Sequence, residues 1–479
     1  MASRATGGEI DGNFQDEPDP RREASRGLLC PDDRPRMSSA NGDAASPSDP
    51  SPPPAPEAFA VSQVYSTYVL VLLFGVAVLN MLDRQILGML VVPIKAEFGV
   101  SDTAIGFLTG PSFALFYALA GIPIARWADR GVRRSIISLG LLVWSGLTLA
   151  SGMVGHFGQL VVARLGVGVG EAAGTPPSHA LISDYFPPER RAFALAVFTV
   201  GASTGVAMAH LVGGWVGEIW GWRMVFVVAG VPGVLLAVLM RFTVREPPRG
   251  RFEGNPLPRG RESWLTAIGV LARIPSYRHL VASASLHSFA FSGSMIWYPP
   301  FLTRVHGLSP SEIGTSLALY SSLPAGIGIF VGGILTDRLM RRDIRWLQGY
   351  AGITMLAFAP FALGFLFLPG RTLAFGCLVI SAFLMGTSTP GIHVTTQALA
   401  PARMRSLASA INLLLLSLVG AGLGPFFVGV MNDVLEPRLG SEAVRYTLSA
   451  VALTAVWSSL HNFLSARHLA HDLERRWER

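Results

Sequence analysis

Four acidic or basic residues other than histidine lie inside stretches that are otherwise apolar, and these are Asp83, Arg84, Arg164 and Glu171. Placing an ionisable group inside a membrane costs about 3 kcal/mol even on the gentler insertion scale, so each is a functional-site hypothesis by default. A low-dielectric cavity favours a protonated carboxyl, whereas a nearby arginine favours the carboxylate, so the two together can hold and release a proton. An arginine fork also suits a phosphate or carboxylate. The chemistry predicted here is proton coupling or binding of an anionic head group.

The spacing of these residues predicts how they meet. Asp83 and Arg84 are neighbours, so on a helix their side chains point about 100° apart and cannot both face one partner squarely. Arg164 and Glu171 are seven apart, which puts them on one helix face two turns apart. A buried network of charges lowers the folding stability unless its geometry is excellent, so helix packing alone is a poor explanation for these residues. We expect Asp83 to be the main proton acceptor and Glu171 to tune it.

The composition places these residues in a membrane protein. The chain has 479 residues, of which 50% are hydrophobic and 14% are charged, and its mean hydropathy is +0.44. An ordinary soluble domain carries about 25% charged residues, so a typical cytosolic enzyme, a coiled coil and a disordered protein are excluded. The two cysteines, Cys30 and Cys377, form neither a disulfide framework nor a metal knuckle. We expect no metal and no cofactor.

A helix needs about 20 apolar residues to cross the hydrocarbon core. Twelve candidate spans lie at 65–91, 103–125, 135–155, 158–183, 191–217, 223–243, 279–302, 313–337, 346–368, 372–399, 405–431 and 443–466. The predicted organisation is a disordered cytoplasmic N-terminal tail (1–60), a six-helix bundle (65–243), a cytoplasmic central loop (244–277), a second six-helix bundle (279–467) and a cytoplasmic C-terminal tail (468–479). Translation from Met37 is an alternative start.

The basic residues orient the spans. Twenty-four of the 38 lie in the connections after even-numbered spans and in the C-terminal tail, and six lie in the connections on the other side. The positive-inside rule then places both termini in the cytoplasm. The net charge of +7 reflects these arginines, which do not cluster as a nucleic-acid groove requires. We therefore expect no nucleic-acid partner.

The sequence contains an internal repeat. Two connections share the pattern Asp-Arg-x-x-Arg-Arg at an offset of 208, and their residues are Asp129, Arg130, Arg133 and Arg134 in the first and Asp337, Arg338, Arg341 and Arg342 in the second. The loops 187–196 and 401–410 also match, at an offset of 214. Two matches at nearly one offset indicate two related six-span halves, which is an architecture of transporters whose halves rock about a central site.

The Asp-Arg-x-x-Arg-Arg loops resemble the signature loops of the major facilitator superfamily, and so does the segment Trp220–Phe226. The first loop departs from the pattern, because Ala125 and Val132 stand where glycines are expected. The resemblance covers about residues 65–467 and implies the fold of an all-α polytopic membrane protein with twelve transmembrane helices in two pseudo-symmetric bundles. It also implies that the eight loop residues gate the cytoplasmic side through Asp–Arg contacts.

A narrower resemblance is to the Spinster family of lipid transporters. It rests on Asn80–Leu87 in span 1, on Arg164–Ala172 in span 4, on Trp144-Ser145 and on Trp297–Leu302. In that family the matching Asp and Arg of span 1 and Arg and Glu of span 4 are implicated in proton coupling and substrate binding. Eukaryotic members move sphingosine-1-phosphate or lysophospholipids. The resemblance thus implies an amphipathic, lipid-like substrate, and the arginine bias favours a bacterial inner-membrane member.

These observations predict a monomeric secondary transporter, coupled to protons and working by alternating access in the lipid bilayer. The first alternative is a proton-driven organic-anion or drug transporter of the same superfamily, and the second is a polytopic membrane enzyme or sensor. The sequence has no Ser/His/Asp group, no HExxH and no P-loop, so we expect no enzyme. We interpret the histidines inside spans as hydrogen-bonding core residues, and these are His179, His210, His287 and His393. Trp297 near a span end fits an interfacial anchor as well as a substrate contact.

Overall fold

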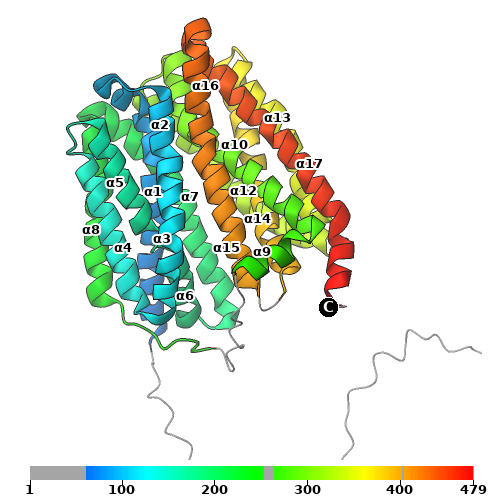
Figure 1. Cartoon of the computed structure of the whole chain (residues 1–479). Coiled ribbons are helices and arrows are strands. Elements are labelled where there is room, and N and C mark those ends of the chain that lie inside the picture. The colour runs from blue at the N-terminus through cyan, green and yellow to red at the C-terminus, as the bar shows by residue number, and fades with distance from the viewer. Residues whose placement is uncertain (1–60, 253–263, 402–403, 478–479) are drawn as a thin grey trace, which may run out of the picture. The chain divides into compact units, whose positions relative to one another are not determined.

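The computed structural model describes residues 61–252, 264–401 and 404–477, and its regular elements in these ranges are all helical (Figure 1). The predicted tail at 1–60 and the alternative start at Met37 lie outside the described residues. We use "first half" for helices α1 to α8. Their bounds are α1 Gln63–Phe98, α2 Asp102–Thr109, α3 Pro111–Arg130, α4 Arg133–Ser151, α5 Phe157–Glu171, α6 Thr175–Tyr185, α7 Pro188–Trp220 and α8 Trp222–Thr243.

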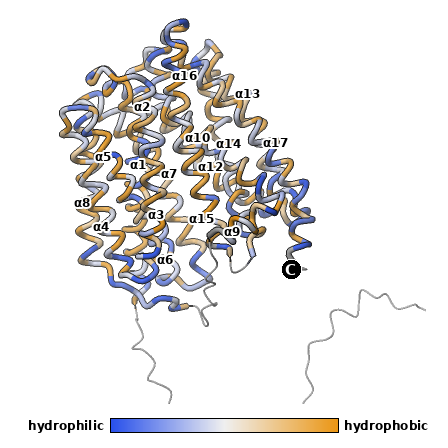
Figure 2. The backbone as a smooth tube through the Cα atoms, in the orientation of Figure 1, coloured by the Kyte–Doolittle hydropathy of each residue, from blue (hydrophilic) through white to orange (hydrophobic). Residues whose placement is uncertain are grey.

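We use "second half" for α10 to α17, with the short helix α9 before it. The bounds are α9 Trp264–Ala272, α10 Pro275–His306, α11 Pro310–Leu317, η2 Ala318–Ser322, α12 Leu323–Met340, α13 Trp346–Phe367, α14 Arg371–Leu399, α15 Arg405–Leu415, η4 Leu416–Gly422, α16 Leu423–Leu439, η5 Gly440–Glu442 and α17 Ala443–Trp477. η2 and η4 are π-helical turns inside longer helices. Figure 2 shows hydrophobic residues along most of the helix lengths.

Among the described residues, nine helical segments are long and apolar enough to cross a membrane. The sequence predicted twelve spans, and each of the other three has a physical reason for the difference. The span at 158–183 is divided into α5 and α6, and each of these helices is too short to count among the nine. The span at 279–302 lies in α10, whose serines and histidines make it too polar to count. The last two spans belong to one continuous helical run, 407–475, which counts once among the nine.

The internal repeat extends into the helix starts. Ser101 caps α2 through a hydrogen bond from Ala104 N to its hydroxyl, and Ser309 caps α11 in a capping box with Glu312. The offset between the two serines is 208, the same as between the Asp-Arg loops. A serine that accepts from a free N–H of the first turn fixes where a helix begins. The two halves therefore start their second spans at equivalent positions.

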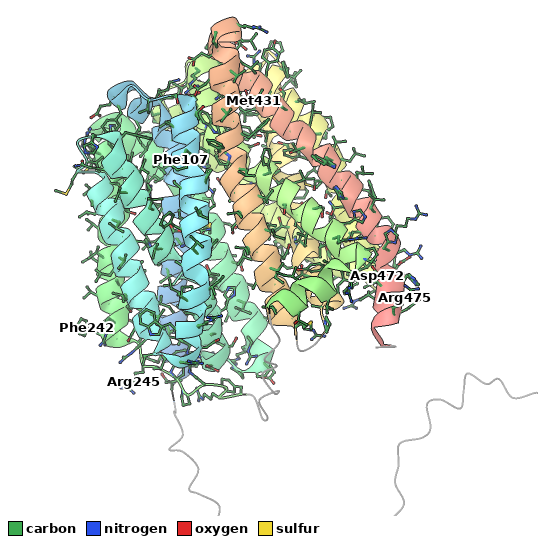
Figure 3. All side chains as sticks on the ribbon, viewed as in Figure 1. Phe107, Phe242, Arg245, Met431, Asp472 and Arg475 are labelled. Carbon is green, nitrogen blue, oxygen red and sulfur yellow. The ribbon has the colours of Figure 1, made fainter. Side chains whose placement is uncertain are left out.

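The two halves touch at one end of the molecule. We call this the closed end, and it carries Ser101 and Ser309. There α2 packs on α16, and α11 packs on α7. The opposite end carries Arg130 and Met340, the last residues of α3 and α12, and we call it the open end. Figure 3 shows Phe107 and Met431 toward the closed end and Arg245 toward the open end.

Glycines allow the helices of the two halves to approach each other. A Cβ at Gly106 of α2 would lie 2.7 Å from Pro425 O, and one at Gly314 of α11 would lie 2.4 Å from His210 O. Gly106 and Gly314 are again 208 residues apart. The crossings are therefore backbone-to-backbone contacts that a side chain would push apart.

Candidate functional site

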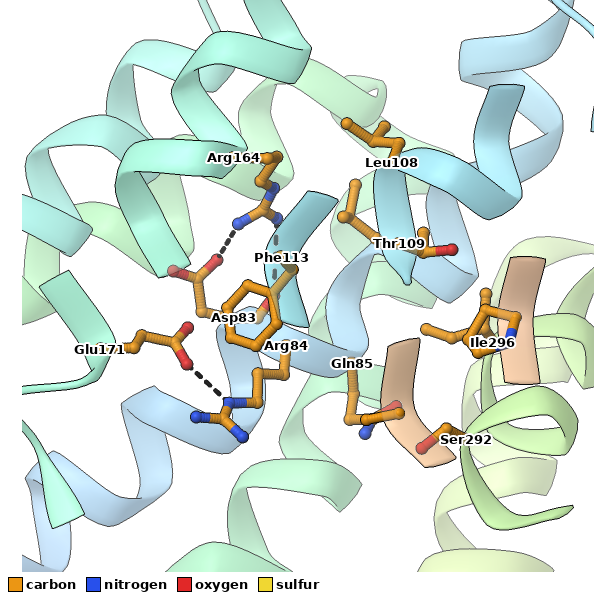
Figure 4. A pocket seen from close by; sticks show the side chains of 13 residues that line it. Asp83, Arg84, Gln85, Leu108, Thr109, Phe113, Arg164, Glu171, Ser292 and Ile296 are labelled. Carbon is orange, nitrogen blue, oxygen red and sulfur yellow. Dashed lines mark hydrogen bonds and ion pairs between the residues drawn. The ribbon is translucent and has the colours of Figure 1, made fainter. Parts of the chain in front are cut away.

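Asp83 of α1 and Arg164 of α5 form a buried ion pair (Figure 4). Arg164 Nη1 lies 2.6 Å from Asp83 Oδ1, and the two side chains are 3% and 4% exposed. Thr148 of α4 donates its hydroxyl to Asp83 Oδ2. The Arg164 guanidinium lies 5.0 Å from the ring centre of Phe226 in α8. Both carboxylate oxygens of Asp83 therefore have a partner, and this pair joins four helices of the first half.

Arg84 and Glu171 form the second pair. Arg84 Nε lies 2.6 Å from Glu171 Oε2, and Asn80 donates to the same oxygen at 3.1 Å. Glu171 is fully buried, and its Oε1 has no hydrogen-bond partner. Arg84 is 22% exposed, and its guanidinium lies 4.9 Å from the ring centre of Phe113 and 4.5 Å from that of Tyr117. This pair thus combines an unsatisfied carboxylate oxygen with a guanidinium that reaches open space.

The helix geometry explains why there are two pairs. Asp83 and Arg84 are adjacent on α1, so their side chains diverge by about 100° and reach different turns of the neighbouring helix. On α5, Arg164 and Glu171 stand two turns apart on one face and meet them separately. Glu171 is the last residue of α5, before the break that precedes α6. The structure brings the four predicted residues together as neighbouring ion pairs.

The four residues line a cavity of about 70 Å³ that also has walls from the second half. Figure 4 shows Ile296 and Ser292 of α10 across from Gln85 of α1. Ala421 and Pro425 of the second half also contribute to the wall. The charges come from the first half, and the second half supplies apolar or hydroxyl groups. A molecule bound here would contact both halves.

A second cavity of about 510 Å³ lies between α3 and α15 on the side of the open end. Its walls are mainly apolar and include Tyr117, which stacks on Arg84. Arg126 and Asp129 also line this cavity. Tyr117 therefore connects the charged residues with the larger apolar space.

The predicted gating residues of the first loop have different environments. Arg133 is buried, its guanidinium pairs with Asp184, and its Nε lies 2.7 Å from Glu246 Oε1. Arg134 N donates to Glu246 Oε2 at 2.9 Å, while Asp129 and Arg130 are exposed. The partners Asp184 and Glu246 lie within the first half and just after its last helix, so these contacts do not reach the second half. A latch between the halves therefore stays a prediction.

The second loop differs from the first although its sequence matches. All four of its predicted gating residues are exposed, namely Asp337, Arg338, Arg341 and Arg342. Arg341 is the repeat counterpart of the buried Arg133. The equal motif thus does not produce equal burial in the two halves.

Sequence reasoning missed a further buried charge centre, at the closed end. Asp102 of α2 is fully buried and pairs with Arg304 of α10 and with Lys95 of α1, whose Nζ lies 2.8 Å away. Asn432 of α16 donates to Asp102 Oδ2 at 3.0 Å. Asp433 accepts hydrogen bonds from the backbone N–H groups at the start of α2. The only sequence signal was an acid directly after a capping serine, which is also typical of an exposed helix start.

The structure corrects three smaller expectations. Trp297 is fully buried and donates its Nε1–H to Pro425 O at 3.0 Å, so its prediction as an interfacial anchor is wrong. His179 and His393 are exposed, so the core interpretation is wrong for them. His210 and His287 are buried and hydrogen-bonded, to Ser322 and Ser388 respectively, which confirms that interpretation.

Comparisons with known proteins agree with this fold. Residues 73–425 match the Major Facilitator Superfamily. An MFS-type efflux pump of Mycolicibacterium smegmatis is 32% identical over 401 residues, which is 83% of this chain and 92% of the relative. Protein spinster homolog 1 of Mus musculus is 28% identical over 410 residues, covering 78% of this chain and 75% of the relative.

A solved structure is similar in both sequence and fold. It is the crystal structure of a bacterial homolog to the human lysosomal transporter Spinster in an inward-facing and unoccupied conformation. The identity is 32%, the TM-score is 0.78, and the match covers 86% of this chain and 99% of the other. The chain therefore belongs to the major facilitator superfamily, in its Spinster-like group, and is a membrane transporter and not an enzyme.

Proposed function

We propose that this transporter is proton-coupled and moves an amphipathic or lipid-like substrate, of the lysolipid or sphingoid type, by alternating access. The observation that carries the proposal is the set of two buried acid–arginine pairs in the wall of a cavity between the halves. Buried ion pairs contribute little to stability when compared with well-packed apolar residues. Their place beside a cavity that both halves line supports a role in transport.

Asp83 and Glu171 are the proposed proton-coupling residues, and the geometry distinguishes their roles. Both oxygens of Asp83 have partners, in Arg164 and Thr148. Glu171 has a fully buried Oε1 without a hydrogen-bond partner, and a proton there would neutralise the carboxylate without displacing Arg84 from Oε2. Glu171 is therefore the better first acceptor, and Asp83 follows when Arg164 moves away. This order reverses the expectation from sequence.

Arg84 and Arg164 are the proposed ion-pair or substrate-binding residues. Arg84 is 22% exposed, whereas Arg164 is 3% exposed. A proton on Glu171 would remove the negative charge that holds Arg84, so the guanidinium would then attract an anionic head group more strongly. Proton binding and anion binding at this site favour each other.

The membrane placement is also proposed. The loops with the excess of arginines support a placement in which both termini lie in the cytoplasm of a bacterial cell, with the chain in the inner membrane. A monomer remains part of this proposal. The open end, which carries Arg130 and Met340, would then face the cytoplasm. The lipid bilayer, the proton and the small substrate are the partners.

A second candidate is a proton-driven drug or organic-anion transporter of the same superfamily. It is favoured by the similarity to the MFS-type efflux pump of Mycolicibacterium smegmatis. The charged pairs serve this function equally well, so the substrate must be decided by a transport panel.

The deciding experiment uses purified full-length protein in proteoliposomes with an imposed pH gradient. Uptake is measured for lysophospholipids, sphingosine-1-phosphate, a small organic anion and a cationic dye. We expect gradient-driven uptake of the lysolipids, reduced to the level of protein-free liposomes in Glu171→Gln. The matched control is Glu97→Gln, because Glu97 lies on α1 but is 41% exposed and remote from the cavity.

Three results would count against the proposal. Uptake of the dye or the small anion without lysolipid uptake would support the second candidate. Full gradient-driven uptake in both Glu171→Gln and Asp83→Asn would exclude these residues as proton carriers. Uptake that is independent of any gradient would exclude proton coupling altogether.

A further inference from the structure

Three histidines meet where α10 packs on α17, in the second half. His279 lies near the start of α10, and His461 and His468 lie on α17, seven residues apart and therefore on one face of the helix. The ring centres of His279 and His461 are 5.2 Å apart. The rings of His279 and His468 are stacked, with centres 6.2 Å apart. The proposed transport function gives these three side chains no role.

The contact between α10 and α17 is fixed by hydrogen bonds on both sides of His279. Before it, the backbone N–H and the hydroxyl of Ser276 donate to Asp472 Oδ2 at 2.9 and 2.6 Å, and Figure 3 shows Asp472 on the side of the open end. After it, Ser458 donates its hydroxyl to Ser283 O at 2.9 Å. The two helices therefore present the histidines to each other at a set distance.

The shortest contact in this group joins two ring nitrogens. His279 Nδ1 lies 2.9 Å from His461 Nδ1. Two nitrogens that each lie about 2.0–2.1 Å from a metal ion are this far apart when the angle at the ion is about 90°. A right angle is typical of the square-planar and tetragonal sites of Cu²⁺ and Ni²⁺. A tetrahedral Zn²⁺ site would separate the nitrogens by about 3.3 Å, so the spacing fits Cu²⁺ or Ni²⁺ better.

The surroundings leave room for an ion and for its other ligands. His279 and His461 are half-buried, so water reaches the edge of the pair. A neutral imidazole offers Nδ1 as a ligand when its proton is on Nε2, so both rings can bind one ion without a change in their charge. In the described part of the chain no group of three or more metal-ligating side chains already surrounds one point. The remaining ligands of the ion would therefore be water.

We infer that His279 and His461 form a two-histidine chelate for a divalent transition-metal ion of the Cu²⁺ or Ni²⁺ type. The Nδ1 atoms of the two rings bind the ion, which joins the start of α10 to α17. The same helix α10 contributes Ile296 and Ser292 to the wall of the cavity beside the charged pairs. The site lies within the second half, so the inference depends neither on proton coupling nor on the nature of the substrate.

The test measures Cu²⁺ binding to full-length protein that carries no histidine tag, in lipid nanodiscs at about pH 7.5, where an ordinary imidazole is neutral. Calorimetry gives the affinity, and electron spin resonance of the bound Cu²⁺ shows how many nitrogens are ligands. The wild type should show two imidazole nitrogens. His279→Ala and His461→Ala should each weaken binding by about tenfold or more, because the second imidazole binds as an intramolecular ligand. The two losses should not add in the double variant, since either change alone destroys the chelate.

His471→Ala is the matched control. His471 is exposed on the same helix and lies three residues after His468, so these two side chains could chelate an ion on α17 alone. His471→Ala should bind Cu²⁺ as the wild type does. A saturating amount of Ni²⁺ should raise the melting temperature of the wild type and of His471→Ala, because the ion binds the folded state. It should not raise that of His279→Ala.

Three outcomes would overturn the inference. One is an unchanged Cu²⁺ affinity in His279→Ala, and another is a wild-type spectrum with a single nitrogen ligand. The third is a loss in His471→Ala as large as that in His279→Ala, which would place the ion on α17 alone. Size-exclusion chromatography checks that each variant is folded, and His279→Gln replaces His279→Ala if the latter is not. Failure of the proposed function is distinguishable, because it would appear as missing proton-driven uptake while Cu²⁺ binding and the effect of His279→Ala remain.

Discussion

At the closed end, several charged groups of one half bind groups of the other, whereas the buried Arg133 at the open end binds groups of its own half and of the segment directly after it. Asp102 of the first half pairs with Arg304 and accepts from Asn432 of the second. Asp433 and Glu218 each accept a backbone N–H at the start of a helix in the opposite half. At the open end, by contrast, Arg133 is held between Asp184 and Glu246.

The difference predicts which contacts would break if the transporter changed conformation by the proposed alternating access. Rocking two halves past each other leaves contacts inside each half intact and separates contacts between them. The fully buried Asp102 would lose Arg304 and Asn432 if the closed end opened. Arg133 would keep its partners throughout. We therefore expect the closed-end charges to set the conformational equilibrium and the open-end charges to set the stability of the first half.

The largest expected effect is for Asp102→Asn. The substitution removes the charge that Arg304 and Lys95 share, and breaking a buried pair in this way costs about 3 kcal/mol or more. The closed state should lose more than about a hundredfold in population relative to the open one. Pulsed electron spin resonance between labels at Ala96→Cys and Arg438→Cys, both exposed at this end, should show longer distances. The two label sites are introduced into a variant in which the native Cys30 and Cys377 have been replaced, so that only the new cysteines carry labels.

Asp102→Asn has its own control in Asp433→Asn. Asp433 accepts two backbone N–H groups but pairs with no arginine or lysine at ion-pair distance among the described residues. Its change should therefore move the label distances less than that of Asp102. An unchanged distance distribution in Asp102→Asn would show that the charged contacts do not hold this end closed.

The second effect concerns the two matching loops at the open end. Arg133→Gln should lower the free energy of unfolding by about 2 kcal/mol, because it leaves the buried Asp184 without its charged partner. Arg341→Gln, its repeat counterpart, should leave the melting temperature unchanged, since Arg341 is exposed. Thermal unfolding followed by tryptophan fluorescence measures both. Equal melting temperatures for the two variants would remove the distinction between the loops.

A third and smaller effect tests the apolar part of the closed end. In Gly314→Ala the new Cβ would lie 2.4 Å from His210 O, and such overpacking costs about 1–2 kcal/mol. The label distances should lengthen as in Asp102→Asn, but to a smaller extent. Gly333→Ala on α12 is the control, because no atom lies within 4 Å of its Cβ. If both glycine variants behave alike, the helix crossing does not limit opening.

Much of the fold could be predicted because hydropathy and loop charge act locally along the chain. The breaks inside spans were harder. A Gly110-Pro111 dipeptide marks the division between α2 and α3, and Pro176 follows the division between α5 and α6. These signals lie inside apolar runs, where length alone favours one continuous helix. The π-turns η2 and η4 have no sequence signal that we can identify.

The site was predictable in part for a similar reason. Asp83 and Glu171 stand out because a charge inside an apolar run is unusual. The spacing on each helix could not tell which acid meets which arginine, since that depends on how α1 and α5 rotate against each other. Asp102 stands at a span edge, where acids are common, and its partner Arg304 is 202 residues away. Its burial follows from the contact between the halves, which no local pattern encodes.

The smallest expected effect is for Glu97→Gln. This variant decides whether the closed end is held by its contacts between the halves or by its net charge. Glu97 pairs with Arg223 at 2.6 Å at the same end as Asp102, but both residues belong to the first half and are about 40% exposed. Exposed pairs contribute little, and this one does not join the halves, so the label distances should equal those of the wild type. If Glu97→Gln opened this end as Asp102→Asn does, the net charge of the end would control opening. If only Asp102→Asn opens it, the control lies in the contacts that cross from one half to the other.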